Sequence, residues 1–333
     1  MISDAVPPQD NSSVDRQPVK REQRQPNDGQ RRQRFLVLGG GEGWHANQLR
    51  SAADDRGCEI AFGTYPSLSA SIGPAGGTTI DCDAGSLATF DAILTRTMPM
   101  GTIETLTFRL ATLHGLSDAG ITAALVNPAR SLEIAIDKFA TLAKVASLGY
   151  PVPETVVVQS RSQAIDAFRS LGGDVVVKPI FGGEGRGVMR VRDPELAWYT
   201  FSTLESLGAV AYVQAFVPPG GRDRRLLVIG DQVWGFRRTN ERDFRTNVSG
   251  GGETLPFDVS DEQSTLAKRI CQSIGLKFAS VDLLDCEGGP DCVVEVNGIP
   301  GWKGAQAVCE TNLADQIISL LCHQAAIRHE VAA

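Results

Sequence analysis

A lysine at the end of an apolar run, followed at once by glycines, is the strongest chemical signal in the sequence. Residues 175–188 read Val-Val-Val-Lys-Pro-Ile-Phe-Gly-Gly-Glu-Gly-Arg-Gly-Val. Glycines let backbone N–H groups approach oxyanions closely, and Lys178 adds a compact positive charge beside them. This arrangement predicts a phosphate-binding loop, and a flexible surface hairpin is the alternative. No Gly-Lys-Ser or Gly-Lys-Thr ends the loop and a strand is expected after it, so it is not a Walker A motif.

Acidic and amide side chains on two later strands form a second signal. Asp282 lies in the apolar run 281–284, and Glu295 and Asn297 lie in the run 294–297, with a Gly-Gly-Pro turn between them. Residues two apart on a strand share a face, and their oxygens are hard ligands suited to Mg²⁺. A hairpin with a merely solvated polar face is the alternative. Its apolar neighbours favour a buried hairpin, in which unpaired carboxylates are costly.

Arginines beside a glycine turn form a third cluster. It comprises residues 237–240 and 243–247, followed by three glycines at 250–252, with Asp223 and Arg225 upstream. Guanidinium groups bind carboxylate or phosphate oxygens in pairs, so the cluster predicts an anion site. A solvated basic loop is the alternative.

The elements that position these residues begin with alternating strands and helices. A buried-type strand at 35–38 precedes a glycine-rich turn and a helix that runs through residue 56. Further strands are expected at 59–62, 92–95 and 123–126, with a helix at 103–119. This alternation predicts a parallel sheet.

Two further regions follow the break at Asn127-Pro128. The second is expected to have helices at 136–148 and 194–207, a further helix that opens at 160–163, and strands at 155–158, 174–178, 188–191 and 210–217. The third is expected to have strands at 225–229, 232–237, 278–285 and 292–296, and helices at 261–274 and 312–327. Gly230-Asp231 is a suitable hairpin turn between the first two strands of the third region.

Composition excludes several classes of protein. The 333 residues allow two or three lobes, and 42% hydrophobic with 21% charged residues is ordinary for a globular protein. A net charge of −7 argues against a nucleic-acid partner bound by a broad basic surface. No apolar run approaches the roughly 18 residues that span a bilayer, so no membrane association and a cytoplasmic location are expected. Residues 1–34 contain almost no large apolar side chains, which predicts a disordered tail.

Four motifs in this order resemble the ATP-grasp superfamily, and within it the RimK-like amino-acid ligases. They are Asp137-Lys138-Phe139 with 149–155, Val177-Lys178-Pro179 with its loop, residues 243–247, and Glu295-Val296-Asn297 with Pro300-Gly301. The resemblance covers residues 35–325. It implies an α/β fold (an α+β grasp), with a Rossmann-like domain at 35–128, a central domain at 129–217 and a C-terminal metal-binding domain at 218–333.

The resemblance also implies a role for each site residue. ATP would be held by Lys138 and Lys178 at its phosphates, by the covering loop with Gly182, Gly183, Gly185 and Gly187, by the hinge residues Gln214, Phe216 and Val217, and by the anion cluster with Asp223 and Arg225. Mg²⁺ or Mn²⁺ would be bound by Asp282, Glu295 and Asn297. Arg237 and Asn247 would face the transferring phosphate and the acyl phosphate. Relatives commonly carry glutamate where this hinge has Ala215, which puts the adenine contacts in doubt.

The implied chemistry is γ-phosphate transfer to a carboxylate, attack by an amine and loss of phosphate. Residues 95–101 with Phe108-Arg109 are similar to a subgroup associated with tetrahydromethanopterin-dependent metabolism. This similarity suggests addition of L-glutamate to a pterin cofactor, with glutamylation of a ribosomal-protein tail as the neighbouring possibility. The expected partners are therefore an amino acid and a carboxylate acceptor, and a homo-oligomer is the common default.

Two other functions remain as alternatives. Residues 41–46 fit the G-x-G-x-x-A pattern of a nicotinamide-dependent oxidoreductase, but no acidic residue closes the next expected strand. A non-catalytic ATP-binding module is the second alternative, because a grasp fold can bind nucleotide without turnover.

Overall fold

A computed structural model of the chain describes residues 31–332 except 75, 184, 247–250 and 287–288. Residues 1–30 of the predicted tail 1–34 lie outside the described residues. Arg34, the last residue of that predicted tail, belongs to a strand. Residues 32–333 form one compact unit.

The first sheet is parallel throughout, as predicted, in the order β2-β1-β6-β7. Its strands are β1 (Arg34–Leu38), β2 (Glu59–Gly63), β6 (Ala92–Thr95) and β7 (Ala124–Val126). All four residues from Phe35 to Leu38 are buried, because helices cover both faces of a parallel sheet and its strands are therefore continuously apolar.

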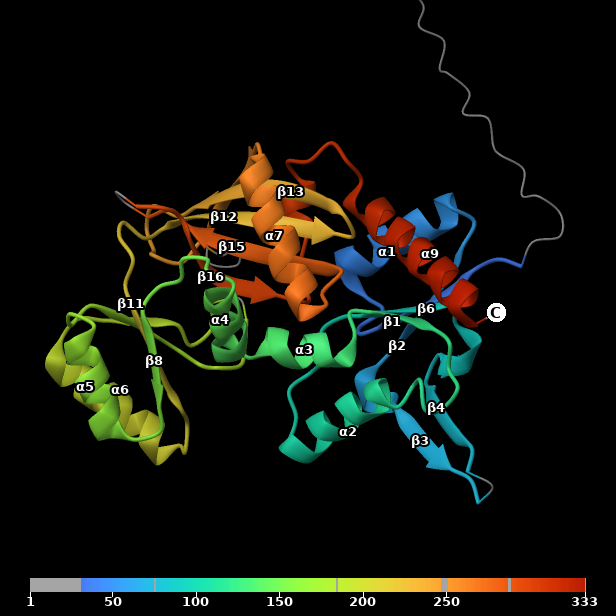
Figure 1. Cartoon of the computed structure of the whole chain (residues 1–333), viewed down its shortest axis with the longest axis horizontal. Helices are drawn as coiled ribbons and strands as arrows, with labels where there is room; N and C mark the ends of the chain where they lie inside the picture. The colour runs from blue at the N-terminus through green and yellow to red at the C-terminus, as the bar shows by residue number, and fades with distance from the viewer. Residues whose placement is uncertain (1–30, 75, 184, 247–250, 287–288, 333) are drawn as a thin grey trace, which may run out of the picture. The chain divides into compact units, whose positions relative to one another are not determined.

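Helices from distant parts of the chain cover this sheet (Figure 1). On one face lie α1 (Gly43–Asp55) and the last helix, α9 (Leu313–Ala332), and the residues Phe35, Leu49 and Ile317 belong to one core. On the other face, α2 (Ile103–His114) and α3 (Ala129–Ile136) contribute to a second core. The C-terminal helix therefore completes the packing of the N-terminal sheet, and the predicted boundary at 128/129 stays a prediction.

A small antiparallel sheet, absent from the prediction, follows β2. It comprises β3 (Ser69–Ile72), β4 (Thr78–Cys82) and β5 (Gly85–Ser86), with the 3-10 turns η1 (Tyr65–Ser67) and η2 (Leu87–Thr89) beside it. The side chains of β3 are all exposed, so the segment lacks the apolar alternation on which strand prediction rests.

The predicted helix at 136–148 is α4 (Lys138–Ser147) in the structure, and α3, which precedes it, was not predicted. Asp137 separates α3 from α4, and its Oδ1 accepts hydrogen bonds from the backbone N–H groups of Phe139 and Ala140. Such side-chain capping satisfies backbone donors that the first helical turn leaves unpaired. The cap fixes Lys138 as the first residue of α4.

The central sheet is antiparallel, in the order β10-β9-β11-β8. Its strands are β8 (Thr155–Val158), β9 (Val175–Lys178), β10 (Met189–Val191) and β11 (Ala211–Ala215). The helices α5 (Arg161–Ser170) and α6 (Pro194–Ser206) pack on it through Phe168 and Phe201.

The third sheet is antiparallel, in the order β14-β13-β12-β15-β16 (Figure 1). Its strands are β12 (Arg222–Ile229), β13 (Gln232–Thr239), β14 (Glu253–Phe257), β15 (Phe278–Leu284) and β16 (Cys292–Asn297). The helix α7 (Asp261–Ile274) begins with a capping box between Ser260 and Gln263 and packs on one face of this sheet. The strand β14 and the short helix α8 (Lys303–Gln306) were not predicted.

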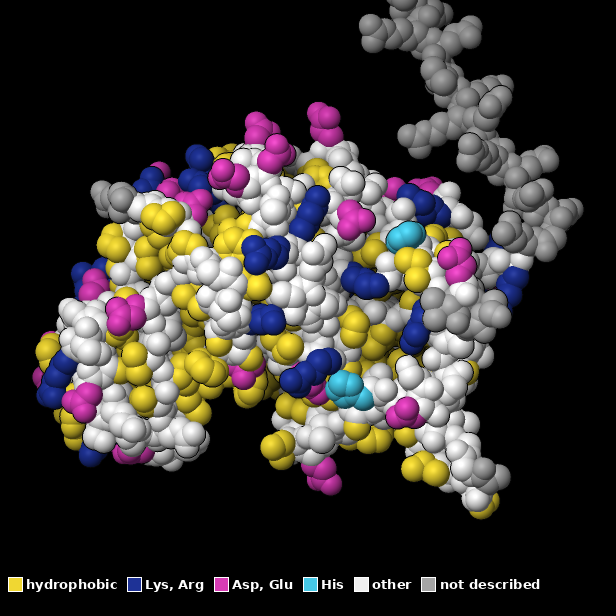
Figure 2. Space-filling model, in the orientation of Figure 1, with side chains coloured by type: hydrophobic (Ala, Val, Ile, Leu, Met, Phe, Trp, Pro, Cys, Tyr) yellow, Lys and Arg dark blue, Asp and Glu magenta, His cyan; other side chains and the backbone are white. Residues whose placement is uncertain are grey.

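The surface charge and the character of the helices concern two kinds of partner considered from composition, nucleic acid and membrane. Figure 2 shows Lys and Arg side chains interspersed with Asp and Glu over the face drawn. Within the described part of the chain, no helix has the length and apolar character needed to cross a membrane.

Candidate active site

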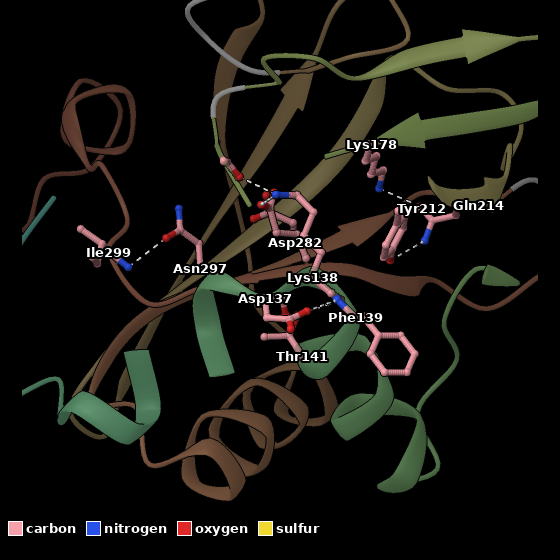
Figure 3. A network of polar contacts seen from close by, with 12 residues as sticks. Asp137, Lys138, Phe139, Thr141, Lys178, Tyr212, Gln214, Asp282, Asn297 and Ile299 are labelled. Carbon is pink, nitrogen blue, oxygen red and sulfur yellow. Dashed lines mark hydrogen bonds and ion pairs between the residues drawn. The ribbon is translucent and has the colours of Figure 1, made fainter. Parts of the chain in front are cut away.

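Lys178 lies at the end of β9 and is directed at the neighbouring strand β11. Its Nζ donates to Oε1 of the buried Gln214 at 2.7 Å, and the Gln214 amide donates to Thr155 Oγ1 at 2.9 Å (Figure 3). The pKa of Lys178 is lowered to about 8, mainly by burial; Glu295 opposes this shift and the positive charge of Lys138 adds to it. The lysine therefore lacks a strong counter-ion and can be stabilised by an anion.

Lys138 joins two segments that are far apart in the sequence. Its Nζ donates a hydrogen bond to the carbonyl oxygen of Gly182 in the glycine loop, and the same atom lies 3.9 Å from Glu295 Oε1 on β16. In Figure 3 its side chain extends toward the strand that carries Asp282. The structure thus places one ammonium group between the predicted phosphate loop and the predicted metal ligands.

The glycine loop uses backbone conformations that disfavour other residues. Gly182, Gly185 and Gly187 have φ values of 122°, 70° and 72°. Side chains with a Cβ rarely adopt this region, so the loop depends on glycine at these positions. Gly183 has open space where a Cβ would project, and Glu184 lies outside the described residues.

The residues of the predicted hinge lie at the end of β11 and directly after it. The Phe216 N–H donates to the carbonyl of Asp174 at 3.0 Å, and the guanidinium carbon of Arg190 lies 3.3 Å from the Phe216 ring centroid. Arg190 also forms a two-bond ion pair with Asp174. Phe216 is thereby held by both its backbone and its ring, and Val217 follows it half-buried.

The predicted metal ligands come together on two neighbouring strands. Asp282 on β15 lies opposite Glu295 on β16, and Asn297 follows two residues later on the same strand face. The register shifts immediately after Asp282. Asn297 Oδ1 accepts the Ile299 N–H at 2.8 Å, which orients the amide (Figure 3).

Two arginines hold Asp282, which is only 2% exposed. Arg225 donates to both carboxylate oxygens at 2.8 and 2.7 Å, and Arg238 donates to Oδ2 at 2.8 Å. Burial by itself would raise the pKa of Asp282, but these two guanidinium groups keep it below its ordinary value. Asp282 is therefore a carboxylate at neutral pH.

Arg238 also joins Asp282 to Asp223. It donates to both oxygens of Asp223 at 2.7 and 2.5 Å, and the Thr246 hydroxyl donates to Asp223 as well. Burial raises the pKa of Asp223 despite Arg238. This network connects β12, β13 and β15 to the segment that precedes Asn247, and Asn247 itself lies outside the described residues.

The structure does not bring Arg237 into this cluster. Its side chain is exposed, and its register partner is Arg224. Successive residues of a strand point to opposite faces, so Arg237 lies on the face where Leu226 and Val228 pack against α7. Arg238, which is 7% exposed, is the arginine beside the carboxylates. Strand alternation relative to Asp223 could have identified it from the sequence.

The donor set fits a small divalent cation. Asp282 Oδ1 accepts one bond and Asn297 Oδ1 accepts one, and each oxygen has two lone pairs. Among the described residues, the Glu295 carboxylate pairs with Lys138 at 3.9 Å. Over the described residues, no three His, Cys, Asp or Glu side chains cluster as metal ligands, so an amide oxygen must complete this set. Oxygen ligands of this kind suit Mg²⁺.

Comparisons with known proteins identify the family of this chain and its structural relatives. Residues 135–321 match the model of the RimK-like ATP-grasp domain. The chain is 28% identical over 320 residues to tetrahydromethanopterin:alpha-L-glutamate ligase of Methanosarcina acetivorans, covering 84% of this chain and 95% of that one. It is 31% identical over 278 residues to a probable alpha-L-glutamate ligase of Sodalis glossinidius, covering 82% and 91%. The solved structure of the ATP-grasp ligase PsnB complexed with minimal precursor superposes with a TM-score of 0.70 at 22% identity, covering 87% of this chain and 98% of that one.

Proposed function

Because this chain belongs to the RimK-like ATP-grasp family, whose members are ATP-dependent ligases that form carbon–nitrogen bonds, we propose that it joins the amine of L-glutamate to the carboxylate of an acceptor. The observation that carries the proposal is the position of Lys138, whose ammonium group contacts both the glycine loop and Glu295. A nicotinamide-dependent oxidoreductase is not favoured, since β2 ends at Gly63 without an acidic residue.

In the proposed complex, the triphosphate of ATP is bound by Lys138, Lys178 and the loop 182–187. Lys178 has a lowered pKa and a neutral partner in Gln214, so a phosphate oxygen would give it the counter-ion that it lacks. Because the Gln214 side chain is engaged by Lys178 and Thr155, the hinge residues Gln214, Phe216 and Val217 would meet adenine through their backbone.

Asp282, Glu295 and Asn297 are proposed to hold Mg²⁺, and the same hard oxygen set suits Mn²⁺. ATP-grasp ligases bind ATP with Mg²⁺, which when bound neutralises phosphate charge and orients the γ-phosphate. Arg225 and Arg238 keep Asp282 ionised and fixed in orientation.

The proposed reaction has two steps. An acceptor carboxylate oxygen attacks the γ-phosphorus, the bond to ADP breaks, and an acyl phosphate forms. The glutamate amine then attacks the acyl carbon, inorganic phosphate leaves, and the amine loses a proton. Such transfer depends mainly on positioning and on neutralising charge, which Lys138, Lys178 and the arginine network can supply. Arg238 replaces Arg237 in this proposal, and Asn247 keeps its predicted role beside the acyl phosphate.

The acceptor is proposed to be a pterin cofactor of the tetrahydromethanopterin type. This rests on the coverage of nearly the whole length of the tetrahydromethanopterin:alpha-L-glutamate ligase. A protein or peptide is the second candidate, because the structurally similar PsnB was solved with a precursor. A homo-oligomer stays a prediction.

The test is ADP formation by the purified protein with ATP and Mg²⁺. Each of the twenty amino acids would be combined in turn with a tetrahydromethanopterin-type pterin or with a peptide that has a free C-terminus. The proposal expects ADP release that requires both L-glutamate and one acceptor, with a product heavier by one glutamyl residue in mass spectrometry. ADP release without a ligated product would identify a nucleotide hydrolase or binder instead.

A further inference from the structure

The carboxyl ends of β1 and β6 meet at the point where the first sheet changes direction. From β1 the chain proceeds to β2 on one side, and β6 lies on the other side. Ligands of open parallel sheets bind at such switch points. Gly39 follows β1 and Arg96 follows β6, and a Cβ built on Gly39 would lie only 2.7 Å from the Arg96 Cβ. An arginine therefore stands directly at this switch point.

Arg96 has no carboxylate partner among the described residues. Its NH1 donates to the carbonyl of Pro300 at 2.9 Å, and its guanidinium carbon lies 4.9 Å from the Trp302 ring centroid and 5.6 Å from that of Phe278. A guanidinium has five N–H donors, so most of its hydrogen-bonding capacity remains for a ligand. Burial lowers the pKa of Arg96 to about 10, which still leaves it charged at neutral pH.

A second cation, the exposed Lys303, lies close to Arg96. The positive charges of Arg96 and Lys303 both affect the pKa of His45. The Nε2 atom of His45 accepts the Trp302 backbone N–H at 3.3 Å. Burial, then Arg96 and then Lys303 lower the pKa of His45 to about 4. Two cations therefore contribute a positive field at His45, although the whole chain carries a net charge of −7.

The start of α1 adds to this field. Glu42 occupies the cap position without a side-chain cap bond, and the first turn of this 13-residue helix holds no acidic residue. The positive end of the helix dipole and its free N–H groups favour anions. A Cβ built on Gly40 or Gly43 would meet no atom within 4 Å, so there is space beside the helix start.

Two buried polar atoms near Arg96 also lack partners. Neither the Tyr65 hydroxyl nor the Trp302 indole N–H has a hydrogen bond among the described residues, and the two residues are 2% and 0% exposed. Burial raises the pKa of Tyr65, while the charges of Arg96 and Arg109 oppose the rise. Unsatisfied buried donors are uncommon in native proteins and require an explanation. Trp302 belongs to the core on the α1 side of the sheet and Tyr65 to the core on the other side. A polar ligand held by Arg96 would account for the Trp302 N–H.

We propose that Arg96, Lys303 and the start of α1 bind a carboxylate of the incoming amino acid. This inference rests on the proposed function, because it assigns the substrate that this edge of the sheet receives. Arg96 is fixed to Pro300, three residues beyond the proposed metal ligand Asn297. An amino acid whose amine attacks the acyl phosphate beside Asn297 has its own carboxylates a few bonds away. Through Pro300, Arg96 contacts the segment that leads from Asn297 to this edge of the sheet.

The experiment is calorimetric titration of L-glutamate into the full chain saturated with Mg²⁺ and a non-hydrolysable ATP analogue. Arg96→Gln and Lys303→Gln remove the two charges. Arg34→Gln is the matched control, since it removes an arginine charge at the opposite end of β1, where Arg34 pairs with Glu59. The melting temperature of each variant reports whether it folds.

We expect Arg96→Gln to weaken L-glutamate binding by about tenfold or more. Lys303→Gln should weaken it less, because an exposed charge is screened, and nucleotide affinity should stay unchanged in both. The inference is overturned if L-glutamate binds these variants as tightly as it binds the wild type. Wild type that binds nucleotide but not L-glutamate refutes the proposed amino acid, and the same variants are then titrated with the amino acid that supports ligation. Failure of wild type to bind nucleotide refutes the proposed function instead.

Discussion

The Nζ atom of Lys138 lies 3.9 Å from Oε1 of Glu295, although the two residues are separated by more than 150 positions in the sequence. Lys138 starts α4 and Glu295 belongs to β16, so this pair links the central part of the chain to the C-terminal sheet. The same ammonium group donates to the carbonyl of Gly182. The proposed phosphate and metal sites therefore share one residue, and their functions should depend on each other.

Nucleotide affinity should depend on the protonation of Lys178. Its pKa of about 8 in the nucleotide-free protein means that the ammonium form, which binds phosphate, is lost as the pH rises through 8. We expect affinity for ATP, measured by calorimetry at pH 7, 8 and 9, to fall across this range. In Lys178→Arg, which stays charged, this decline should disappear.

The lowered pKa of Lys178 also makes the stability of the fold depend on pH, in the direction opposite to that of ATP affinity. Unfolded lysine titrates near 10.5, so between about pH 8 and 10.5 the unfolded chain binds more protons than the folded one. The contribution of Lys178 to the free energy of unfolding therefore rises with pH in this window. For the binding prediction, an affinity for ATP that stays constant from pH 7 to 9 would contradict the assignment of Lys178 to phosphate.

Replacement of Glu295 by glutamine should raise the metal requirement. A neutral amide is a weaker ligand than a carboxylate, so the Mg²⁺ concentration that gives half-maximal ADP formation should rise on the order of tenfold. Glu253→Gln, an exposed change on β14 at the opposite edge of the same sheet, is the control and should leave the requirement unchanged. Removal of the metal with EDTA should stop ADP formation, and added Mg²⁺ or Mn²⁺ should restore it. Identical Mg²⁺ curves for the two variants would remove Glu295 from the metal site.

Replacement of the adjacent arginines Arg237 and Arg238 on β13 should have different effects on the free energy of unfolding. Arg238→Gln leaves Asp223 and Asp282 buried without their shared counter-ion, which should lower the free energy of unfolding by about 3–5 kcal/mol. Arg237→Gln changes an exposed side chain and should stay within about 0.5 kcal/mol of the wild type. Urea denaturation at pH 7 measures both values. Equal losses in the two variants would mean that the strand faces are assigned incorrectly.

Asn127 should be important for stability because it connects β7 to the strands of the metal site. Its amide donates to the carbonyls of Phe278 and Gly298, and its Oδ1 accepts the N–H groups of Lys277 and Phe278. Asn127→Ala leaves these buried groups without partners, so the free energy of unfolding should fall by about 3 kcal/mol or more. Asn47→Ala, which changes an exposed side chain on α1, is the control, with an expected change within about 0.5 kcal/mol. A loss at Asn127 no larger than at Asn47 would exclude this role.

Much of the fold could be predicted because local patterns determine it. The apolar run at 35–38 predicted β1, and the turn at Gly230-Asp231 predicted the β12–β13 hairpin. The small sheet β3-β4-β5 was missed because the side chains of β3 are all exposed and show no apolar alternation. The packing of α9 against the first sheet was also missed, since no local pattern indicates which distant surface a helix covers.

The candidate site was predictable in residue type but not in pairing. The sequence indicated Asp282, Glu295 and Asn297 as one cluster, and the register of β15 and β16 brings them together. It did not indicate that Arg225 and Arg238 hold Asp282, because such contacts depend on the order of three strands. The choice between Arg237 and Arg238 required the strand face, which alternation relative to Asp223 supplies.

The most direct test is calorimetric titration of a non-hydrolysable ATP analogue into the wild-type chain with Mg²⁺ present and absent. We predict one nucleotide bound per chain with Mg²⁺, and binding at least about tenfold weaker in Lys178→Ala and Lys138→Ala variants that melt near the wild-type temperature. Absence of nucleotide binding by the folded wild type with Mg²⁺ would contradict the account.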